Sequence, residues 1–131
     1  MKIEISYEGS RGVNAMVNGH LIKTDQPIDA GGENSASTPF ELFLASLATC
    51  AGIYIKLFCE NRNLPTEWIK IVHESKHDQV TGLLNKITIE ISVPKKFPEK
   101  YHDTLIAVAG KCKVKQTIFN PPEITTLVKV N

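Results

Sequence analysis

Residues 38–62, TPFELFLASLATCAGIYIKLFCENR, decide the fold of this chain. Thr38 is a typical helix N-cap, Pro39 suits the first helical position, and Glu41 can reach back to the amide of the cap residue, which completes a capping box. An Asn-Leu-Pro sequence directly after this stretch ends the pattern. We therefore predict one long helix that begins at the capping box and runs to about residue 62.

This predicted helix is apolar on every side. A helix of that kind must be covered all round, and one sheet can cover only one side of it. The uncharged segment between Glu41 and Lys56 is shorter than the ~20 residues that a membrane-spanning helix needs, so we predict a buried core helix and no membrane partner. The same helix of a second copy could pack against the side that the sheet leaves uncovered, so we predict a homodimer. The apolar positions are Leu42, Phe43, Leu44, Leu47, Ile53, Tyr54, Ile55, Leu57 and Phe58.

Strands and shorter helices flank this central helix. Before it, apolar and polar residues alternate over residues 3–7 and 13–17, Asn18-Gly19 is a strong signal for a two-residue hairpin, and a third strand over 20–24 leads into a polar loop. The later predicted elements are strands near 69–72 and 87–93, a helix from Pro98 to Gly110, a short helix over 112–119 and a closing strand over 124–130. The order βββ-α-ββ-α-β, built from hairpins, indicates an α+β fold in a single domain over residues 1–131.

Composition excludes several classes of protein. The chain has 131 residues, of which 42% are hydrophobic and 22% charged, so a folded domain is expected. Lys and Arg number 15 against 14 Asp and Glu, and a net charge of +1 argues against a nucleic-acid partner. Three cysteines do not make a secreted disulfide scaffold, and the first residues alternate like a strand rather than forming a signal peptide. We expect thiols in a reducing cytoplasm.

Helix geometry limits which of the three cysteines can form a disulfide with each other. Cys50 and Cys59 are nine residues apart on the predicted helix, so they lie on opposite faces, roughly 13 Å apart along the axis. A disulfide cannot span that distance, so any functional pair includes Cys112. Lys111 and Lys113 flank Cys112, and their charge favours a thiolate nearby. The alternative interpretation is that Cys50 serves only as a small hydrophobic residue of the core.

The stretch from Thr38 to Cys50 resembles the helix signature of the OsmC/Ohr family, the osmotically inducible and organic hydroperoxide resistance proteins. In that family a proline, an acidic-leucine pair and an alanine-rich helix lead to a cysteine at the same distance. A second family cysteine lies in a Cys-x-Val pattern, which Cys112-Lys113-Val114 matches. The opening strands, residues 24–27 and the Gly31-Gly32 loop extend the resemblance over most of the chain.

The resemblance implies an OsmC-like fold in an intertwined homodimer that reduces organic hydroperoxides in the stress response. It makes Cys50 the peroxidatic thiolate and Cys112 the resolving thiol, with an external dithiol as reductant. It also assigns Arg11 to the site, where its guanidinium favours the thiolate and polarises the peroxide. The alternative for Arg11 is a solvent-exposed arginine of a turn. The resemblance implies no cofactor and no metal.

One position departs from the family pattern. The peroxidase branches have a glutamate directly after the helix proline, where it pairs with the arginine, and this chain has Phe40. Glu41 follows, but its capping role already explains it. Peroxidase activity is therefore expected to be modest. The alternative functions are a non-catalytic homodimer that binds a small apolar or acidic molecule, and a structural domain with inert thiols.

Two further patterns do not change this interpretation. His73 and His77 have a spacing that can hold a metal on a helix, but they fall on a predicted strand and the turn after it, and no third ligand is near in sequence. Gly31-Gly32 is read as a linker, because no phosphate-binding Lys-Ser/Thr follows it.

Overall fold

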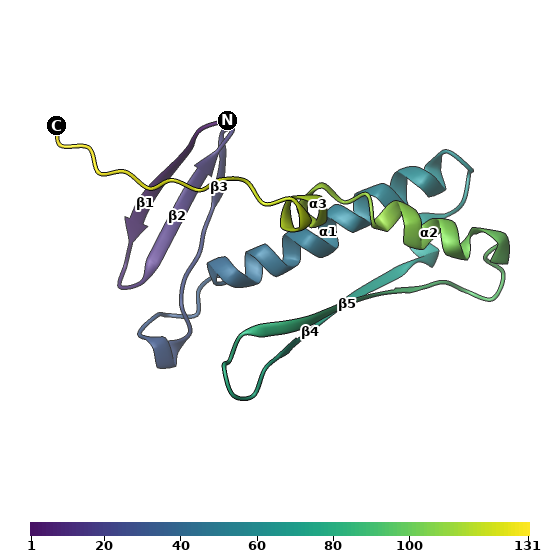
Figure 1. Cartoon of the computed structure of the whole chain (residues 1–131), viewed down its shortest axis with the longest axis horizontal. Coiled ribbons are helices and arrows are strands. Elements are labelled where there is room, and N and C mark those ends of the chain that lie inside the picture. Colours follow the sequence, from purple (N-terminus) through teal and green to yellow (C-terminus); the bar gives the residue numbers. More distant parts are fainter. The chain divides into compact units, whose positions relative to one another are not determined.

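The computed structural model describes all 131 residues and divides them into two compact units, residues 1–45 and 46–131 (Figure 1). The fold is the predicted mixture of helices and small antiparallel sheets, so the α+β class is confirmed. The elements in chain order are β1 (Ile3–Glu8), β2 (Gly12–Val17), β3 (His20–Ile22), the 3-10 turn η1 (Ile28–Ala30), α1 (Pro39–Glu60), η2 (Thr66–Trp68), β4 (Lys70–His77), β5 (Leu84–Ser92), η3 (Glu99–Tyr101), α2 (His102–Ala109) and α3 (Lys113–Phe119).

The first unit is an antiparallel meander in the order β1-β2-β3, followed by a long loop (Figure 1). Asn18 and Gly19 have φ values of 49° and 80°, which are the left-handed values that the predicted two-residue hairpin requires. The third strand ends at Ile22, earlier than predicted. Thr24 still receives a backbone hydrogen bond from the Val13 amide at 3.2 Å, so the loop starts anchored to β2.

The capping box at the start of α1 is confirmed. The Thr38 amide donates to Glu41 Oε2 at 2.8 Å, and the Glu41 amide donates to Thr38 Oγ1 at 3.2 Å. The helix runs to Glu60, close to the predicted end. By length and hydropathy it could cross a membrane, but one of its faces is buried within the second unit, as in the core helix of a globular protein.

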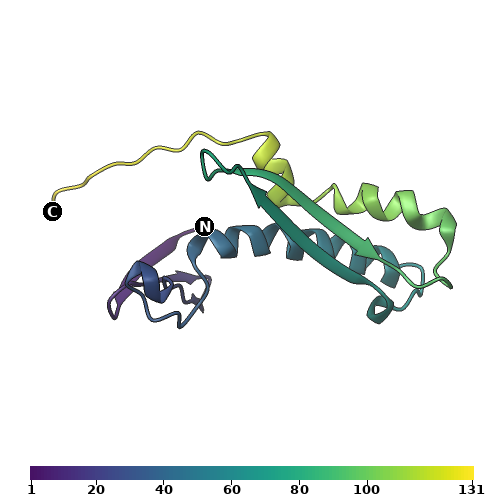
Figure 2. The same ribbon diagram turned by 90° about the horizontal axis from the view of Figure 1, so that it is seen from below.

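The second unit packs α1 against a hairpin and the later helices. In the β4–β5 hairpin, Ile71 pairs with Ile91 and His73 with Ile89. The hairpin lies across one side of α1, and α2 runs alongside (Figure 2). The core has two clusters of buried residues, each with a segment of α1 at its centre. One contains Ile55, Phe58, Cys59, Phe97 and Leu105, and the other contains Leu47, Ala51 and Cys112.

The predicted closing strand over 124–130 is wrong for this single chain. Residues 121–131 have no regular secondary structure and pair with no strand. A segment forms a strand only where a neighbouring strand pairs with its backbone N–H and C=O groups. Residues 124–130 pair with no sheet edge within this chain. Its apolar side chains are therefore left in solvent, Leu127 with 86% and Val130 with 90% of its surface exposed.

Candidate functional site

Two of the three predicted site residues meet in the second unit. Cys50 is half-buried and packs against the small cluster formed by Leu47, Ala51 and Cys112. Cys112 is almost fully buried, with 1% of its surface exposed. Cys59 belongs to the other core cluster and is completely buried. The separation of Cys59 from the pair agrees with the opposite helix faces predicted from the sequence.

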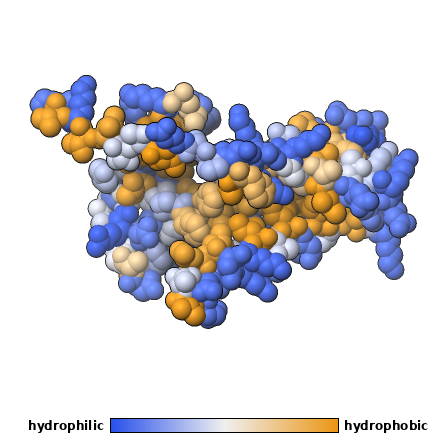
Figure 3. All heavy atoms as spheres, viewed as in Figure 1, coloured by the Kyte–Doolittle hydropathy of each residue, from blue (hydrophilic) through white to orange (hydrophobic).

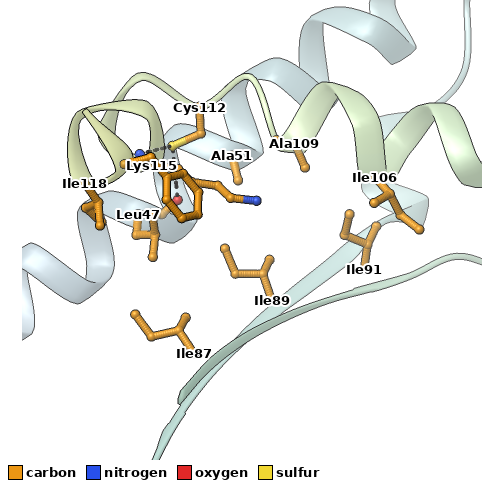
Figure 4. A pocket seen from close by; sticks show the side chains of 12 residues that line it. Leu47, Ala51, Ile87, Ile89, Ile91, Ile106, Ala109, Cys112, Lys115 and Ile118 are labelled. Carbon is orange, nitrogen blue, oxygen red and sulfur yellow. Dashed lines mark hydrogen bonds between the residues drawn. The ribbon is translucent and has the colours of Figure 1, made fainter. Parts of the chain in front are cut away.

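The start of α3 fixes the Cys112 thiol. Cys112 is the N-cap of this helix, and its Sγ accepts a hydrogen bond from the Lys115 amide at 3.5 Å. The same thiol donates to the Leu47 carbonyl oxygen of α1 at 3.7 Å. Figure 4 draws both contacts. The Cys112 thiol thus forms hydrogen bonds both to α1, which carries Cys50, and to α3, which follows Cys112.

The pKa values of the two thiols move in opposite directions. The amide of Val114 is the main cause of a lowered Cys50 pKa, and the Cys112 thiol and the Lys113 amide also lower it, against the effect of burial. Burial raises the pKa of Cys112, and the neighbouring Cys50 raises it further. Cys50 is therefore the more readily ionised of the two thiols.

The cause of this asymmetry differs from the one that the sequence suggested. Lys111 and Lys113 were expected to favour a thiolate through their charge. Instead, backbone amides of the first turn of α3 stabilise Cys50, since amides there have no intrahelical acceptor. Lys113 contributes through its amide and not through its ammonium group.

An apolar groove of about 340 Å³ lies beside the thiol pair. On the face drawn in Figure 3, apolar side chains gather over the part of the second unit where α1 and β5 face each other. Cys112 is at the groove's inner wall, and Lys115, which extends into it, is its only charged side chain (Figure 4). The groove is lined by Leu47, Ala51, Ile87, Ile89, Ile91, Ile106, Ala109, Gly110, Cys112, Lys115, Ile118 and Phe119.

Arg11, the third predicted site residue, belongs to the first unit. It lies in the turn that precedes β2 and is exposed, and it forms no ion pair. Its side chain lies over Gly31 of the following loop. Phe40 stacks on Phe43 with ring centroids 5.9 Å apart, so the residue in the family's glutamate position makes an aromatic contact. Whether Arg11 acts in the site stays a prediction.

Sequence reasoning missed Asp25, the residue that organises the loop after β3. Its buried carboxylate accepts hydrogen bonds from the amides of Gln26, Glu33 and Ser35 and from the Ser35 hydroxyl, at 2.7 to 3.1 Å. These bonds lower the Asp25 pKa to about 2, and the bond from the Ser35 hydroxyl has the largest effect. An aspartate that opens a stretch rich in Gly, Asn and Ser was the available signal, because such carboxylates bind nearby amides.

The histidines do not form a metal centre with other ligands. His73 and His77 both lie on β4, so the strand continues through the residues that were predicted to form its turn. No group of three His, Cys, Asp or Glu side chains in the chain lies close enough to hold a metal ion. His73 Nε2 is buried without a hydrogen-bond partner.

Comparison with known proteins agrees with this fold. The family model described as OsmC-like protein matches residues 32–127. A Psychrobacter arcticus protein named for osmotic stress induction and a detoxification response superposes with a TM-score of 0.75, at 19% identity over 89% of this chain and 87% of its own. An OsmC-like protein of Mycoplasma pneumoniae gives a TM-score of 0.71 at 14% identity over 92% and 87% of the two chains. An organic hydroperoxide resistance protein of Elizabethkingia anophelis gives 0.62 at 16% identity over 92% and 90%. A search of curated proteins gives no match.

Proposed function

This chain belongs to the OsmC-like protein family, and from that membership and its thiol pair we propose that it reduces organic hydroperoxides with an external dithiol as reductant. Neighbours of the same fold include organic hydroperoxide resistance proteins, which supports a hydroperoxide as substrate. We place this activity in the cytoplasm, where thiols stay reduced between turnovers.

The observation that carries the proposal is the opposite shift of two adjacent thiol pKa values. A peroxidatic cysteine must be a thiolate, because the thiolate is the nucleophile. A resolving cysteine must stay close and unoxidised until the first step is complete. The lowered pKa of Cys50 and the raised pKa of buried Cys112 meet these two demands.

The reaction balances with these two residues and one dithiol. The Cys50 thiolate attacks the terminal peroxide oxygen, the O–O bond breaks, and the alkoxide takes a proton and leaves as an alcohol. Cys50 is then a sulfenic acid. The Cys112 sulfur attacks the Cys50 sulfur, and hydroxide leaves with the Cys112 proton as water. The external dithiol reduces the disulfide by exchange and becomes a disulfide itself.

Arg11 is proposed to assist the first step. A guanidinium near the thiolate and the peroxide would stabilise the negative charge that moves from sulfur to oxygen. The family pattern holds such an arginine with a glutamate, and Phe40 cannot accept its hydrogen bonds. We infer that Arg11 is less firmly oriented here than in the peroxidase branches and that the rate is correspondingly lower.

We also propose that the active form is an intertwined homodimer. α1 leaves Ile53 and Leu57 exposed on the face that the second unit does not cover, and monomers rarely tolerate extended apolar surface. The apolar tail over 124–130 has no strand partner within the chain. A second copy would cover the helix and offer the tail a sheet edge.

The test is consumption of cumene hydroperoxide in the presence of a small dithiol. The wild type should turn over, and Cys50→Ser should reduce the rate to that of the dithiol alone. Cys59→Ala is the matched control, because it removes a thiol from the other core cluster. Equal rates for the wild type and Cys50→Ser would refute the proposal.

The apolar groove favours a second candidate function, which is the binding of a small apolar or acidic molecule without turnover. Lys115 is the one charged side chain in the groove and could pair with a carboxylate. In this case a fluorescent fatty acid should bind the wild type and Cys50→Ser equally, and Lys115→Met should weaken binding. Peroxide turnover in the wild type with no binding of the fatty acid would exclude this candidate.

A further inference from the structure

The loop after β3 holds the Arg11 side chain at a position where a glycine allows close approach. A Cβ atom added to Gly31 would lie 3.2 Å from Arg11 Nε and 3.6 Å from the nearest terminal nitrogen of the guanidinium. The guanidinium thus lies in the space that a side chain at residue 31 would enter. Gly31 has φ +83°, a left-handed value that other residues adopt only with strain.

Hydrogen bonds on both sides hold Gly31 in place. The Gly31 amide donates to the Ile28 carbonyl at 3.0 Å, and the Ser10 hydroxyl donates to the Gly31 carbonyl at 3.1 Å. Ser10 directly precedes Arg11, so this bond joins the arginine's own turn to the loop. Residues 26 to 35 are in turn gathered around the buried Asp25 carboxylate.

We propose that Gly31 is a positioning residue for Arg11: the loop anchored on Asp25 presents a flat stretch of backbone at residue 31, on which the guanidinium is held. The catalytic consequence rests on the proposed function, in which Arg11 assists the attack of Cys50 on the peroxide. The loop then supplies part of the orientation that a glutamate supplies elsewhere in the family and that Phe40 cannot supply.

The chain provides a matched pair of variants. Gly31→Ala places a methyl group against the guanidinium. Gly19→Ala imposes the same kind of backbone strain, at φ +80°, but its methyl group would have no atom within 4 Å. A difference between the two variants therefore reports the contact with Arg11 and not the loss of a glycine.

The first readout does not depend on activity. Arg11 and Arg62 are the only arginines, so an ¹⁵N-labelled sample shows two Nε–H signals. Arg62, whose guanidinium lies 4.0 Å from the Phe58 ring centroid, is an internal reference. The heteronuclear NOE of Arg11 Nε should be close to that of Arg62 in the wild type and in Gly19→Ala, and should fall in Gly31→Ala alone. An unchanged Arg11 signal in Gly31→Ala, or an equal fall in both variants, would overturn the proposal.

The second readout is kcat/KM for cumene hydroperoxide in a double-mutant cycle. Gly31→Ala should lower it about tenfold, and should have no further effect when Arg11 is already alanine. Equal losses in the presence and absence of Arg11 would show that Gly31 acts on folding and not through the arginine. If Arg11→Ala has no effect on turnover, the catalytic role of Arg11 fails, while the NOE comparison still decides whether Gly31 positions the side chain.

Discussion

The amide of Val114 is expected to set the reactivity of Cys50. Val114→Pro removes that amide, and Val114→Ala is the control for the loss of the valine side chain, which packs against the Cys112 cluster. Val114 is the second residue of α3. Amides of the first helical turn have no intrahelical acceptor, and proline is tolerated there. A hydrogen bond to a charged group contributes about 1.5 to 3 kcal/mol. Because Cys50 is half-buried and water can replace part of the lost bond, we expect the lower end of this range, about 1.5 kcal/mol, which raises the Cys50 pKa by about one unit.

The assay follows the rate of alkylation by iodoacetamide against pH. The background is Cys59→Ala with Cys112→Ser, which leaves Cys50 as the only thiol and keeps a hydroxyl donor beside it. The midpoint should move about one unit upward in Val114→Pro. In the protein that keeps Cys112, the same substitution should lower peroxide consumption near neutral pH about tenfold, with recovery at higher pH. Val114→Ala, which keeps the amide, should change neither quantity. An unchanged midpoint in a folded Val114→Pro protein would refute the assignment of the low Cys50 pKa to the amides of α3.

Three further outcomes are expected. Light scattering at micromolar concentration should return about twice the chain mass of 14.5 kDa, and a stable monomer would contradict the homodimer. Phe40→Glu should lower the Cys50 pKa and raise the peroxidase rate about tenfold, an effect of about 1.4 kcal/mol; an unchanged rate in a variant with an unchanged thermal midpoint would show that Arg11 needs no carboxylate at this position. Asp25 has its pKa lowered from 3.8 to about 2, so its contribution to the free energy of unfolding is complete above pH 3.8 and is lost as the pH falls toward 2. Urea titrations across this range should show that the free energy of unfolding falls in the wild type and falls less in Asp25→Asn. Identical pH profiles of the two proteins would contradict a stabilising role of the Asp25 carboxylate.

Local patterns predicted the elements whose hydrogen bonds are made within a few residues. Two such elements form as predicted, the capping box of Thr38 and Glu41 and the Asn18-Gly19 turn. Each depends only on residues within a few positions of one another. The closing strand over 124–130 fails for the opposite reason. Its alternation describes a segment suited to a sheet, but the pairing edge cannot be found in the segment itself.

The sequence pointed to two cysteines that lie together in the structure, but it did not point to the cause of the pKa difference between them. The resemblance of residues 38–50 to a family signature pointed to Cys50, and the Cys-x-Val pattern pointed to Cys112, which the structure brings into one cluster. The source of the low Cys50 pKa was not predictable, since the amide of Val114 is far from Cys50 along the chain. Only the packing of α3 against α1 brings the two together. The contact between Arg11 and Gly31 could not be predicted either, because the two residues are far apart along the chain.

A single-turnover experiment tests whether Cys50 and Cys112 form one redox pair. The reduced protein receives one equivalent of cumene hydroperoxide without any reductant, and its thiols and disulfides are mapped by mass spectrometry after proteolysis. We expect an intramolecular Cys50–Cys112 disulfide, one equivalent of alcohol released, and Cys59 still reduced. A disulfide that contains Cys59 and leaves Cys112 free, or three thiols that remain reduced while the peroxide persists, would contradict it.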